Sequence, residues 1–338
     1  MTRCIVKKLA VTCAAASVVS MAAAVAPAHA ATHVPCNTTA LRNAITTANT
    51  AGQGSLSLAW GCRYELQTAL PDLTGNLKIS GNGARITRST SAPAFRILTV
   101  EGTVTLNALT VSNGSAVEGG GVRIGPQGTL RATGLAVLNN TATSTPAATS
   151  YGGGIANLGN LHLSLSRVDG NKTVTGPGSP TFALGGGIGN MGGRATISTT
   201  SITNNQAFDL DPNRGPLTSG GGIINFGGGS LTMTGGVISG NDTTARGGGI
   251  SINNGSVALH GVRVANNHAG VSGGGINNFG QLRVTLSTIT NNTVSGPQAE
   301  NGGGISQLAG QTTLTLSRVT GNTPDNCAPT GSIPSCTN

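Results

Sequence analysis

The residues best suited to chemistry in this sequence are two carboxylates and a cation close together in the chain. Asp209 and Asp211 are separated by one residue, and Arg214 follows them. Paired carboxylates perform glycoside hydrolysis, while oxygen ligands beside an Arg or Lys base would suit a calcium-dependent lyase. Asp209, Asp211 and Arg214 are therefore the catalytic candidates. Calcium would be a cofactor only for such a lyase, and no other cofactor and no metal site is predicted.

The other acidic residues lack an acidic partner when the repeats described below are aligned. The aligned neighbours are as follows: Asp169 has Leu138 and Thr203, Asp242 has Gln206 and His268, and Glu118 has Tyr151. Of His162, His260 and His268, no two occupy equivalent positions beside a cysteine or an acid. The sequence therefore gives no support for a catalytic triad, and we expect these histidines to be outward polar residues.

Three aromatic residues are candidates for ligand binding. Tyr151, Phe182 and Phe208 belong to three long segments between repeats, 141–151, 172–184 and 206–219, which we expect to be neighbouring loops that form a lip. Loops on a rigid scaffold commonly carry function. The alternative is that they are surface insertions whose aromatics cover their own loops. With eight aromatic residues in the whole chain, few rings remain as sugar platforms elsewhere.

Residues 1–30 have the features of a signal peptide. A basic start with Arg3 precedes an apolar stretch, and Ala28-His29-Ala30 is typical of a cleavage site. The alternatives are a structural helix or a lipoprotein anchor at Cys13. No later apolar run approaches the ~20 residues needed to cross a bilayer. We therefore expect a secreted, extracellular protein without a membrane span.

Cysteine usage agrees with export. Four of the six cysteines follow the predicted signal peptide: Cys36, Cys62, Cys327 and Cys336. An even number in an exported chain predicts disulfides. Three connectivities are open, and the sequence separation favours Cys36 with Cys62 and Cys327 with Cys336. Zinc binding is the alternative, but neither pair has the expected spacing.

The charge is mildly basic. Of 19 Lys and Arg residues, three lie in the signal peptide, so 16 remain against 10 acids, a net charge of +6. The cations are scattered and form no basic run, which gives nucleic-acid binding little support. Partners open to such a chain are an anionic cell-wall polymer, a polysaccharide or a surface protein, and we expect a monomer.

A repeat of about 25 to 35 residues dominates the chain after residue 118. Seven glycine triplets, each followed by Ile or Val, begin at Gly119, Gly152, Gly185, Gly220, Gly247, Gly273 and Gly302. An asparagine follows each triplet 19 to 21 residues after its first glycine: Asn140, Asn171, Asn205, Asn241, Asn267, Asn292 and Asn322. The residue before each asparagine is always Asn or Gly, the two that best tolerate positive φ. We predict a turn with a left-handed residue there, and an asparagine ladder between repeats.

Between these turns, apolar and polar residues alternate, as in Leu161-His162-Leu163-Ser164-Leu165, which indicates strands. Short strands in such a repeat, with no helical period, predict a coil of parallel strands with Ile and Val stacked inward. The fold class is thus all-β, a right-handed parallel β-helix. Residues 31–70 are predicted as an N-terminal cap with a helix at 38–50, 71–118 as degenerate first rungs, 119–322 as seven repeats, and 323–338 as a C-terminal cap.

The repeats resemble a known type. GGG-(I/V) followed by (I/V)-x-x-N is similar to the GGA(I/L/V) and FxxN repeats of polymorphic outer-membrane proteins, with Gly for Ala and an aliphatic residue for Phe. Over residues 35–325 the chain resembles secreted parallel β-helix proteins of the pectin-lyase-like superfamily. That resemblance implies the fold, which hosts lyases, hydrolases and adhesins. The membrane-anchored members carry a C-terminal translocator barrel, which we do not expect in this chain.

Two functions follow as hypotheses. The first is a non-enzymatic structural, adhesive or cell-wall-associated protein, because paired carboxylates are lacking on the predicted strands. The second is a polysaccharide lyase or glycoside hydrolase of the pectin-lyase-like type, acting at the lip.

Overall fold

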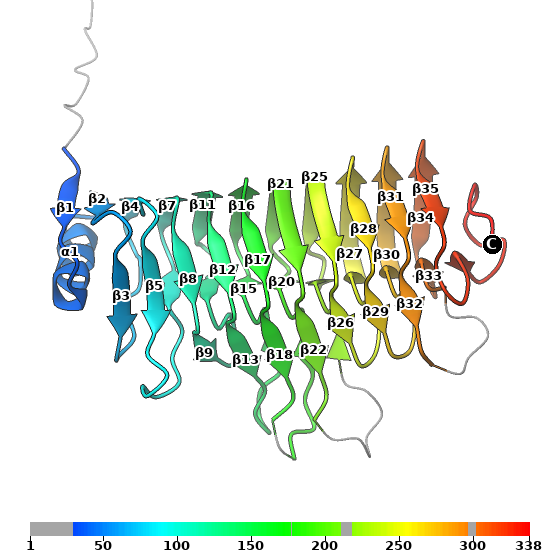
Figure 1. The fold of residues 1–338 in the computed structure, drawn as a ribbon, viewed down its shortest axis with the longest axis horizontal. Coiled ribbons are helices and arrows are strands. Elements are labelled where there is room, and N and C mark those ends of the chain that lie inside the picture. The colour runs from blue at the N-terminus through cyan, green and yellow to red at the C-terminus, as the bar shows by residue number, and fades with distance from the viewer. Residues whose placement is uncertain (1–29, 177, 211–217, 297–301) are drawn as a thin grey trace, which may run out of the picture. The chain divides into compact units, whose positions relative to one another are not determined.

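The structure is a computed structural model that describes residues 30–176, 178–210, 218–296 and 302–338. The chain divides into two units, 1–30 and 31–338. The predicted signal peptide lies outside the described residues except for its last one. Residues 31–338 form a right-handed parallel β-helix (Figure 1). All hydrogen-bonded pairs among its named strands are parallel. The predicted fold class is confirmed.

Successive turns of the coil place their strands in five stacks. Stack 1 contains the strand after each glycine triplet, with β6 (Leu98–Val100) before them and β36 (Cys327–Ala328) after them. The strands that follow the triplets are β10 (Val122–Ile124), β15 (Ile155–Asn157), β20 (Ile188–Met191), β24 (Ile223–Phe226), the first part of β27 (Ile250–His260), the first part of β30 (Ile276–Thr285) and β33 (Ile305–Gln307).

Stacks 2 and 3 follow in the same 26-stranded sheet. Stack 2 contains β1 (Thr32–Val34), β2 (Gln53–Leu58), β4 (Asn76–Ser80), β7 (Thr103–Asn107), β11 (Thr129–Thr133), β16 (Asn160–Ser164), the first parts of β21 (Arg194–Thr203) and β25 (Ser230–Ser239), the second parts of β27 and β30, and β34 (Gln311–Thr315). Stack 3 contains β3 (Arg63–Leu66), β5 (Arg85–Arg88), β8 (Thr110–Ser112), β12 (Ala136–Leu138), β17 (Arg167–Asp169), the second parts of β21 and β25, β28 (Arg263–Ala265), β31 (Thr288–Thr290) and β35 (Arg318–Thr320).

Two smaller sheets complete the coil. Stack 4 contains β9 (Ser115–Ala116), β13 (Thr141–Thr143), β18 (Lys172–Val174), β22 (Gln206–Phe208), β26 (Asp242–Thr243), β29 (His268–Ala269) and β32 (Thr293–Val294). Stack 5 contains β14 (Ser150–Tyr151), β19 (Ala183–Leu184) and β23 (Thr218–Ser219). These strands correct the predicted loops, because the first and last residues of 141–151, 172–184 and 206–219 are strands.

The core is a set of aliphatic ladders along the axis. Ile188, Ile223 and Ile250 pair in register in stack 1 and are fully buried, as are Val168 and Ile202 in stack 3. Each such side chain contributes about 1.5–3 kcal/mol of transfer free energy. Repetition along the axis lets a chain with few aromatics build a continuous core.

The predicted asparagine ladder is confirmed. The Oδ1 atom of each repeat asparagine accepts hydrogen bonds from the backbone N–H and Nδ2 of the preceding one, at 2.8–3.1 Å. Each Nδ2 also donates to a backbone carbonyl, as Asn205 does to Val168 at 3.0 Å. The residue before each asparagine is left-handed, for example Asn204 at φ 54° and Gly240 at φ 65°. The ladder thus satisfies its buried amides completely.

The glycine triplet and the asparagine recur together because they touch. A Cβ on Gly187, the third glycine of its triplet, would lie 3.0 Å from both Cγ and Nδ2 of Asn205 and 2.7 Å from the carbonyl oxygen of Gly222. The first glycine of the triplet turns the chain, as Gly220 does at φ +71°. The triplet is therefore a tight corner.

Two further polar ladders were not predicted. Ser166, Thr200 and Ser287 follow left-handed residues at the bend between stacks 2 and 3. The hydroxyl of each donates to the carbonyl two residues earlier, at 2.8 Å. Inside stack 1, Asn157 donates to Asn190 at 2.7 Å and Asn190 to Asn225 at 2.6 Å.

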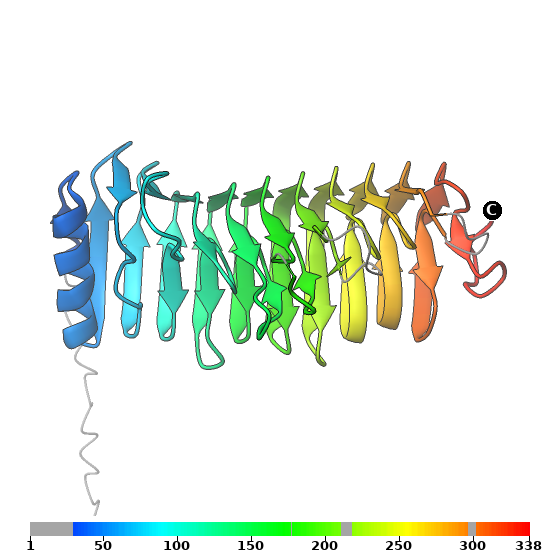
Figure 2. The ribbon, with the colours of Figure 1, turned by 90° about the horizontal axis from the view of Figure 1, so that it is seen from below.

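The N-terminal end is covered by α1 (Thr38–Thr50), which has the predicted bounds. The Asn37 side chain caps it by accepting from the N–H of Ala40 at 3.0 Å, and Leu41, Ile45 and Ala48 are buried. Figure 2 shows the helix beside the first strands, at the end of the solenoid. The Cys36–Cys62 disulfide joins the segment before α1 to the turn before β3.

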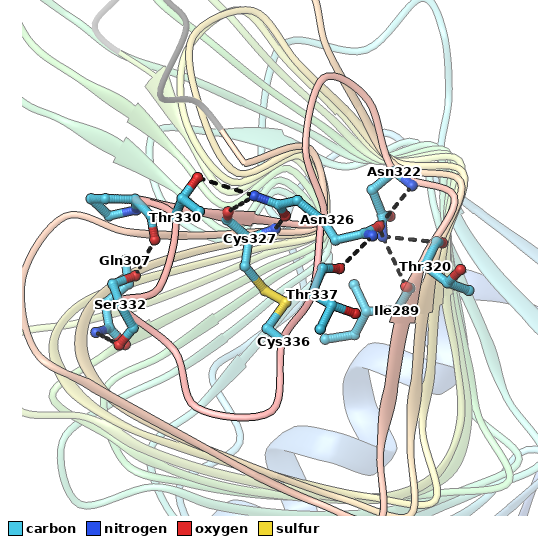
Figure 3. The surroundings of a disulfide bond; sticks show 12 residues. Ile289, Gln307, Thr320, Asn322, Asn326, Cys327, Thr330, Ser332, Cys336 and Thr337 are labelled. Atoms are coloured by element: carbon cyan, nitrogen blue, oxygen red, sulfur yellow. Dashed lines mark hydrogen bonds between the residues drawn. A yellow bond between two sulfur atoms is a disulfide. The ribbon is translucent and has the colours of Figure 1, made fainter.

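The C-terminal end is closed by a short disulfide-bonded loop. The second predicted disulfide, Cys327–Cys336, is also present. Asn326 extends the asparagine ladder beyond Asn322. Its Oδ1 accepts hydrogen bonds from the backbone N–H and the Nδ2 of Asn322, at 3.2 and 3.1 Å. In turn Asn326 donates to the carbonyl of Thr337 at 2.9 Å (Figure 3). Within the described part of the chain, no helix is long and apolar enough to cross a membrane.

Candidate functional site

A groove of about 680 Å³ runs along the outside of the solenoid between stack 5 and the outward side of stack 1. One wall is formed by Tyr151, Leu184 and Ser219, which pair in register in stack 5. The opposite side carries one residue from each of four successive rungs: Met191, Phe226, Asn253 and Phe279. We call this cavity the aromatic groove.

The floor of the aromatic groove is held by contacts between these two walls. Ile224, Ser251 and Asn277 pair in register on three successive strands of stack 1, and all three are buried. Ser219 donates to Ser251 at 2.7 Å, and Ser272 donates to Asn277 at 3.2 Å. Stack 5 is thereby fixed against stack 1, so the groove is part of the rigid scaffold.

The groove concentrates the few aromatic residues of the protein. Tyr151, Phe182, Phe226 and Phe279 line it, which is four of the eight aromatics in the chain. The three phenylalanines are 48%, 37% and 36% exposed in chain order. Arg246 is the one charged residue among the described lining. The groove therefore presents apolar rings with hydroxyls, amides and one cation.

The structure separates the three predicted ligand-binding aromatics. Tyr151 and Phe182 both line the aromatic groove, although Tyr151 is on strand β14. Phe208 is on β22 in stack 4, paired with Val174, and is not among the lining residues. Sequence reasoning missed Phe226 and Phe279, each of which comes six residues after the first glycine of its triplet.

A charged cluster lies at the Tyr151 end of the groove. Arg123 bonds to Glu101 at 2.7 Å and to Glu118 at 3.0 Å. Glu118 is paired with Tyr151 across neighbouring rungs, as the aligned repeats predicted. Burial, and then the neighbouring Glu118, raise the pKa of the Tyr151 phenol well above its usual value. The phenol is therefore protonated at neutral pH and can donate but not accept a proton.

The predicted catalytic residues are only partly described. Asp211 and Arg214 lie outside the described residues. Asp209 accepts a hydrogen bond from the Thr175 hydroxyl at 2.7 Å, and the Thr244 hydroxyl accepts from its backbone N–H at 3.3 Å. No three His, Cys, Asp or Glu residues of the described chain are placed to hold a metal ion.

One pairing was missed in the sequence, and a second was aligned but not recognised as a contact. Glu101 and Glu118 contact the same guanidinium, a pair that the repeat alignment could not show because Glu101 lies in a degenerate rung. His268 Nδ1 lies 2.7 Å from Asp242 Oδ1, so this histidine does have an acidic partner in the next rung. The alignment had placed them side by side.

No protein-family model matches the chain, and no curated protein or solved structure is significantly similar to it.

Proposed function

We propose that this protein is a non-enzymatic, extracellular carbohydrate-binding protein with an adhesive or wall-associated role, which holds a polysaccharide chain in the aromatic groove. The observation that carries this proposal is the exposure of three phenylalanine rings in one groove. Large exposed apolar surfaces on a monomer commonly mark binding sites. Sugar rings have apolar faces and polar edges, which match a surface of rings, hydroxyls and amides.

The spacing of the rings favours an extended glycan. Phe226, Asn253 and Phe279 occupy the same outward position on three consecutive rungs. The two rings are therefore about 10 Å apart along the axis, close to the repeat of an extended β-1,4-linked disaccharide. Alternate sugars of such a chain present the same face, so two of them stack on the rings while the sugar between them meets the Asn253 amide.

The groove gives binding more support than catalysis. Its described lining contains no carboxylate. The two acids near its end, Glu101 and Glu118, are both bonded to Arg123, and the Tyr151 phenol is not a base at neutral pH. Proton abstraction therefore lacks a free base within the described groove.

Secretion is part of the same proposal. The sequence of residues 1–30 supports export, and the two disulfides agree with an oxidising compartment. The resemblance to pectin-lyase-like and polymorphic outer-membrane protein repeats favours an extracellular or surface setting.

The test compares glycan binding by the protein, by two variants of the groove and by one control variant outside it. Cellohexaose and chitohexaose are titrated by calorimetry, and retention on cell walls is compared with an inert protein. Phe226→Ala and Phe279→Ala should each weaken binding about two- to twelve-fold, since a ring contact contributes about 0.5–1.5 kcal/mol. Phe208→Ala, which removes a ring outside the groove, should change nothing. Binding that is absent, or equally weakened by Phe208→Ala, would contradict the proposal.

The second candidate is a polysaccharide lyase or glycoside hydrolase acting at the Tyr151 end of the aromatic groove. It is favoured by the position of the Tyr151 phenol, beside Glu118 and in the groove lining. Product release from a panel of polysaccharides with calcium tests it, with Glu118→Gln, Asp209→Ala and Asp211→Ala as variants. Release that these variants abolish would establish an enzyme, and no release from any polysaccharide would remove this candidate.

A further inference from the structure

The cations of the protein are not spread evenly over its surface. Nine exposed Arg and Lys residues lie on the outward sides of stacks 2 and 3: Arg63, Lys78, Arg85, Arg131, Arg167, Arg194, Arg263, Arg283 and Arg318. Two acids, Glu65 and Asp169, share these strands. We call this surface the basic face.

The basic face accounts for the whole net charge of the folded chain. Nine cations and two acids give it a net charge of +7, whereas the remaining seven cations and eight acids of residues 31–338 sum to −1. Both acids of the face are already paired with its own arginines, Arg63 with Glu65 at 3.1 Å and Arg167 with Asp169 at 2.7 Å. The side chains of the other seven cations have no ion pair within the described residues.

The fold arranges these cations along the axis in two neighbouring rows, one on stack 2 and one on stack 3, and we call the two rows together the line of cations. Stack 3 contains ten strands from β3 to β35, one from each of ten rungs. Eight of these ten rungs carry at least one cation of the basic face. Since rungs are about 4.8 Å apart, the line is about 40–45 Å long. Stacks 2 and 3 meet at a bend and are continuous in β21 and β25, so the two rows lie on adjoining sides of the solenoid (Figure 1).

One histidine, His162, lies among the cations of the basic face. His162 lies in register between Arg131 and the β21 strand that begins with Arg194. Its pKa is lowered by burial and then by these two arginines. Because the like charges disfavour protonation, the local potential is positive.

We propose that the basic face binds a flexible phosphodiester polymer, a chain of polyol-phosphate repeats laid along the axis of the solenoid. Eight of the nine cations are arginines, whose planar guanidinium matches the two free oxygens of a phosphodiester. A flexible chain can turn each phosphate toward a straight line of cations. This proposal is independent of the aromatic groove, which lies on stacks 1 and 5.

Other polyanions fit this surface less well. The backbones of duplex DNA wind around its axis, so a straight line of cations meets them only where they cross it. Single-stranded nucleic acids are held by aromatic stacking along the strand. The described outward strand positions of stacks 2 and 3 carry no aromatic residue, and one exposed ring, Trp60, lies in the turn between β2 and β3. The charges of a stiff polyuronate also turn around its helix, so only some of them face the protein.

Binding of fluorescently labelled poly(glycerol phosphate) to the full protein, followed by anisotropy over a range of NaCl concentrations, tests the proposal. We expect the logarithm of the affinity to fall linearly with the logarithm of salt concentration. Arg131→Ser/Arg194→Ser should make the slope shallower by about 1.4, at about 0.7 per lost contact. Arg194→Glu should weaken binding about five-fold or more near 0.1 M salt, and the polymer should raise the pKa of His162, followed by NMR.

Lys172→Glu is the matched control, because Lys172 is an exposed cation on stack 4 and the change in net charge is the same as for Arg194→Glu. Circular dichroism checks that all variants are folded. Equal weakening by Lys172→Glu would overturn the proposal, as would equal or tighter binding of polygalacturonate or duplex DNA. Phe226→Ala should leave polymer binding unchanged, which separates this proposal from glycan binding in the groove.

Discussion

At the scale of single residues, buried amides hold neighbouring rungs together. Asn205 shows the complete set of contacts. Its Oδ1 accepts from the N–H and Nδ2 of Asn171, both at 3.0 Å, and its own N–H and Nδ2 donate to Asn241 at 3.0 and 2.9 Å. Since all these groups are buried, none can turn to water when a partner is lost.

We therefore expect Asn205→Ala to destabilise the protein strongly. The substitution leaves the N–H and Nδ2 of Asn171 and the Oδ1 of Asn241 with fewer partners, and an unsatisfied buried polar group costs about 1–3 kcal/mol. The expected loss is about 3 kcal/mol or more in the free energy of unfolding, measured with urea. Thr232→Ala, on the exposed side of β25, should change stability by less than about 0.5 kcal/mol. Similar losses in both variants would contradict the structural role of the ladder.

Much of this ladder could be predicted from the sequence because three constraints fall within four consecutive positions. A β-branched residue, a residue that tolerates positive φ and an asparagine recur together in all seven repeats. The inner ladder of Asn157, Asn190 and Asn225 was not predicted, although each of these asparagines comes two residues after the Ile that begins its strand. The contact between His268 and Asp242 needed side-chain geometry that the alignment does not contain.

At the scale of elements, strands were predictable where the alternating pattern is long and not where it is short. Stack 2 has strands of five residues with two inward positions, as in Leu161 and Leu163. The strands of stack 4 have only two or three residues, such as Thr141–Thr143, so they contain no readable period. For this reason the sequence assigned them to loops. Phe226 and Phe279 do share one repeat position, and that shared offset was a usable signal of the groove.

The two disulfides should contribute to stability in the order of their loop lengths. Cys36 and Cys62 are separated by 26 residues, and Cys327 and Cys336 by 9. The chain-entropy relation gives about 3.5 kcal/mol for the first and about 2.6 kcal/mol for the second. Cys36→Ala/Cys62→Ala should therefore lower the free energy of unfolding more than Cys327→Ala/Cys336→Ala, measured with urea under non-reducing conditions. The reverse order would mean that native contacts of the C-terminal loop outweigh the entropic effect.

At the scale of the whole molecule, the fold creates surfaces that the sequence hides. The cations of the basic face are single residues separated by long polar and apolar segments, so no basic run is visible in the chain. Only the stacking of equivalent positions brings them into a line. The same coiling gathers half of the aromatics into one groove. Both binding proposals therefore depend on register, which the repeats specify, and on the choice of outward residue in each repeat, which they leave free.

The ends of the solenoid are its exposed strand edges. At the C-terminal end, β36 pairs with β33 and covers stack 1, whereas β34 and β35 are the last described strands of stacks 2 and 3. An open parallel edge presents unpaired N–H and C=O groups to any second strand. The short length of β35 and the exposed Arg318 on it are features that limit such pairing.

Removal of residues 323–338 should consequently promote self-association. The deletion uncovers the edge of β33 and takes away Asn326, which bonds to the N–H and Nδ2 of Asn322. We expect the shortened protein to form larger species with rising concentration in sedimentation velocity, while the full protein remains a monomer. Cys327→Ala/Cys336→Ala keeps the covering segment but not its disulfide, so it should associate less than the deletion. A shortened chain that stays monomeric at every concentration would show that β34 and β35 already protect this end, and that the tail serves stability alone.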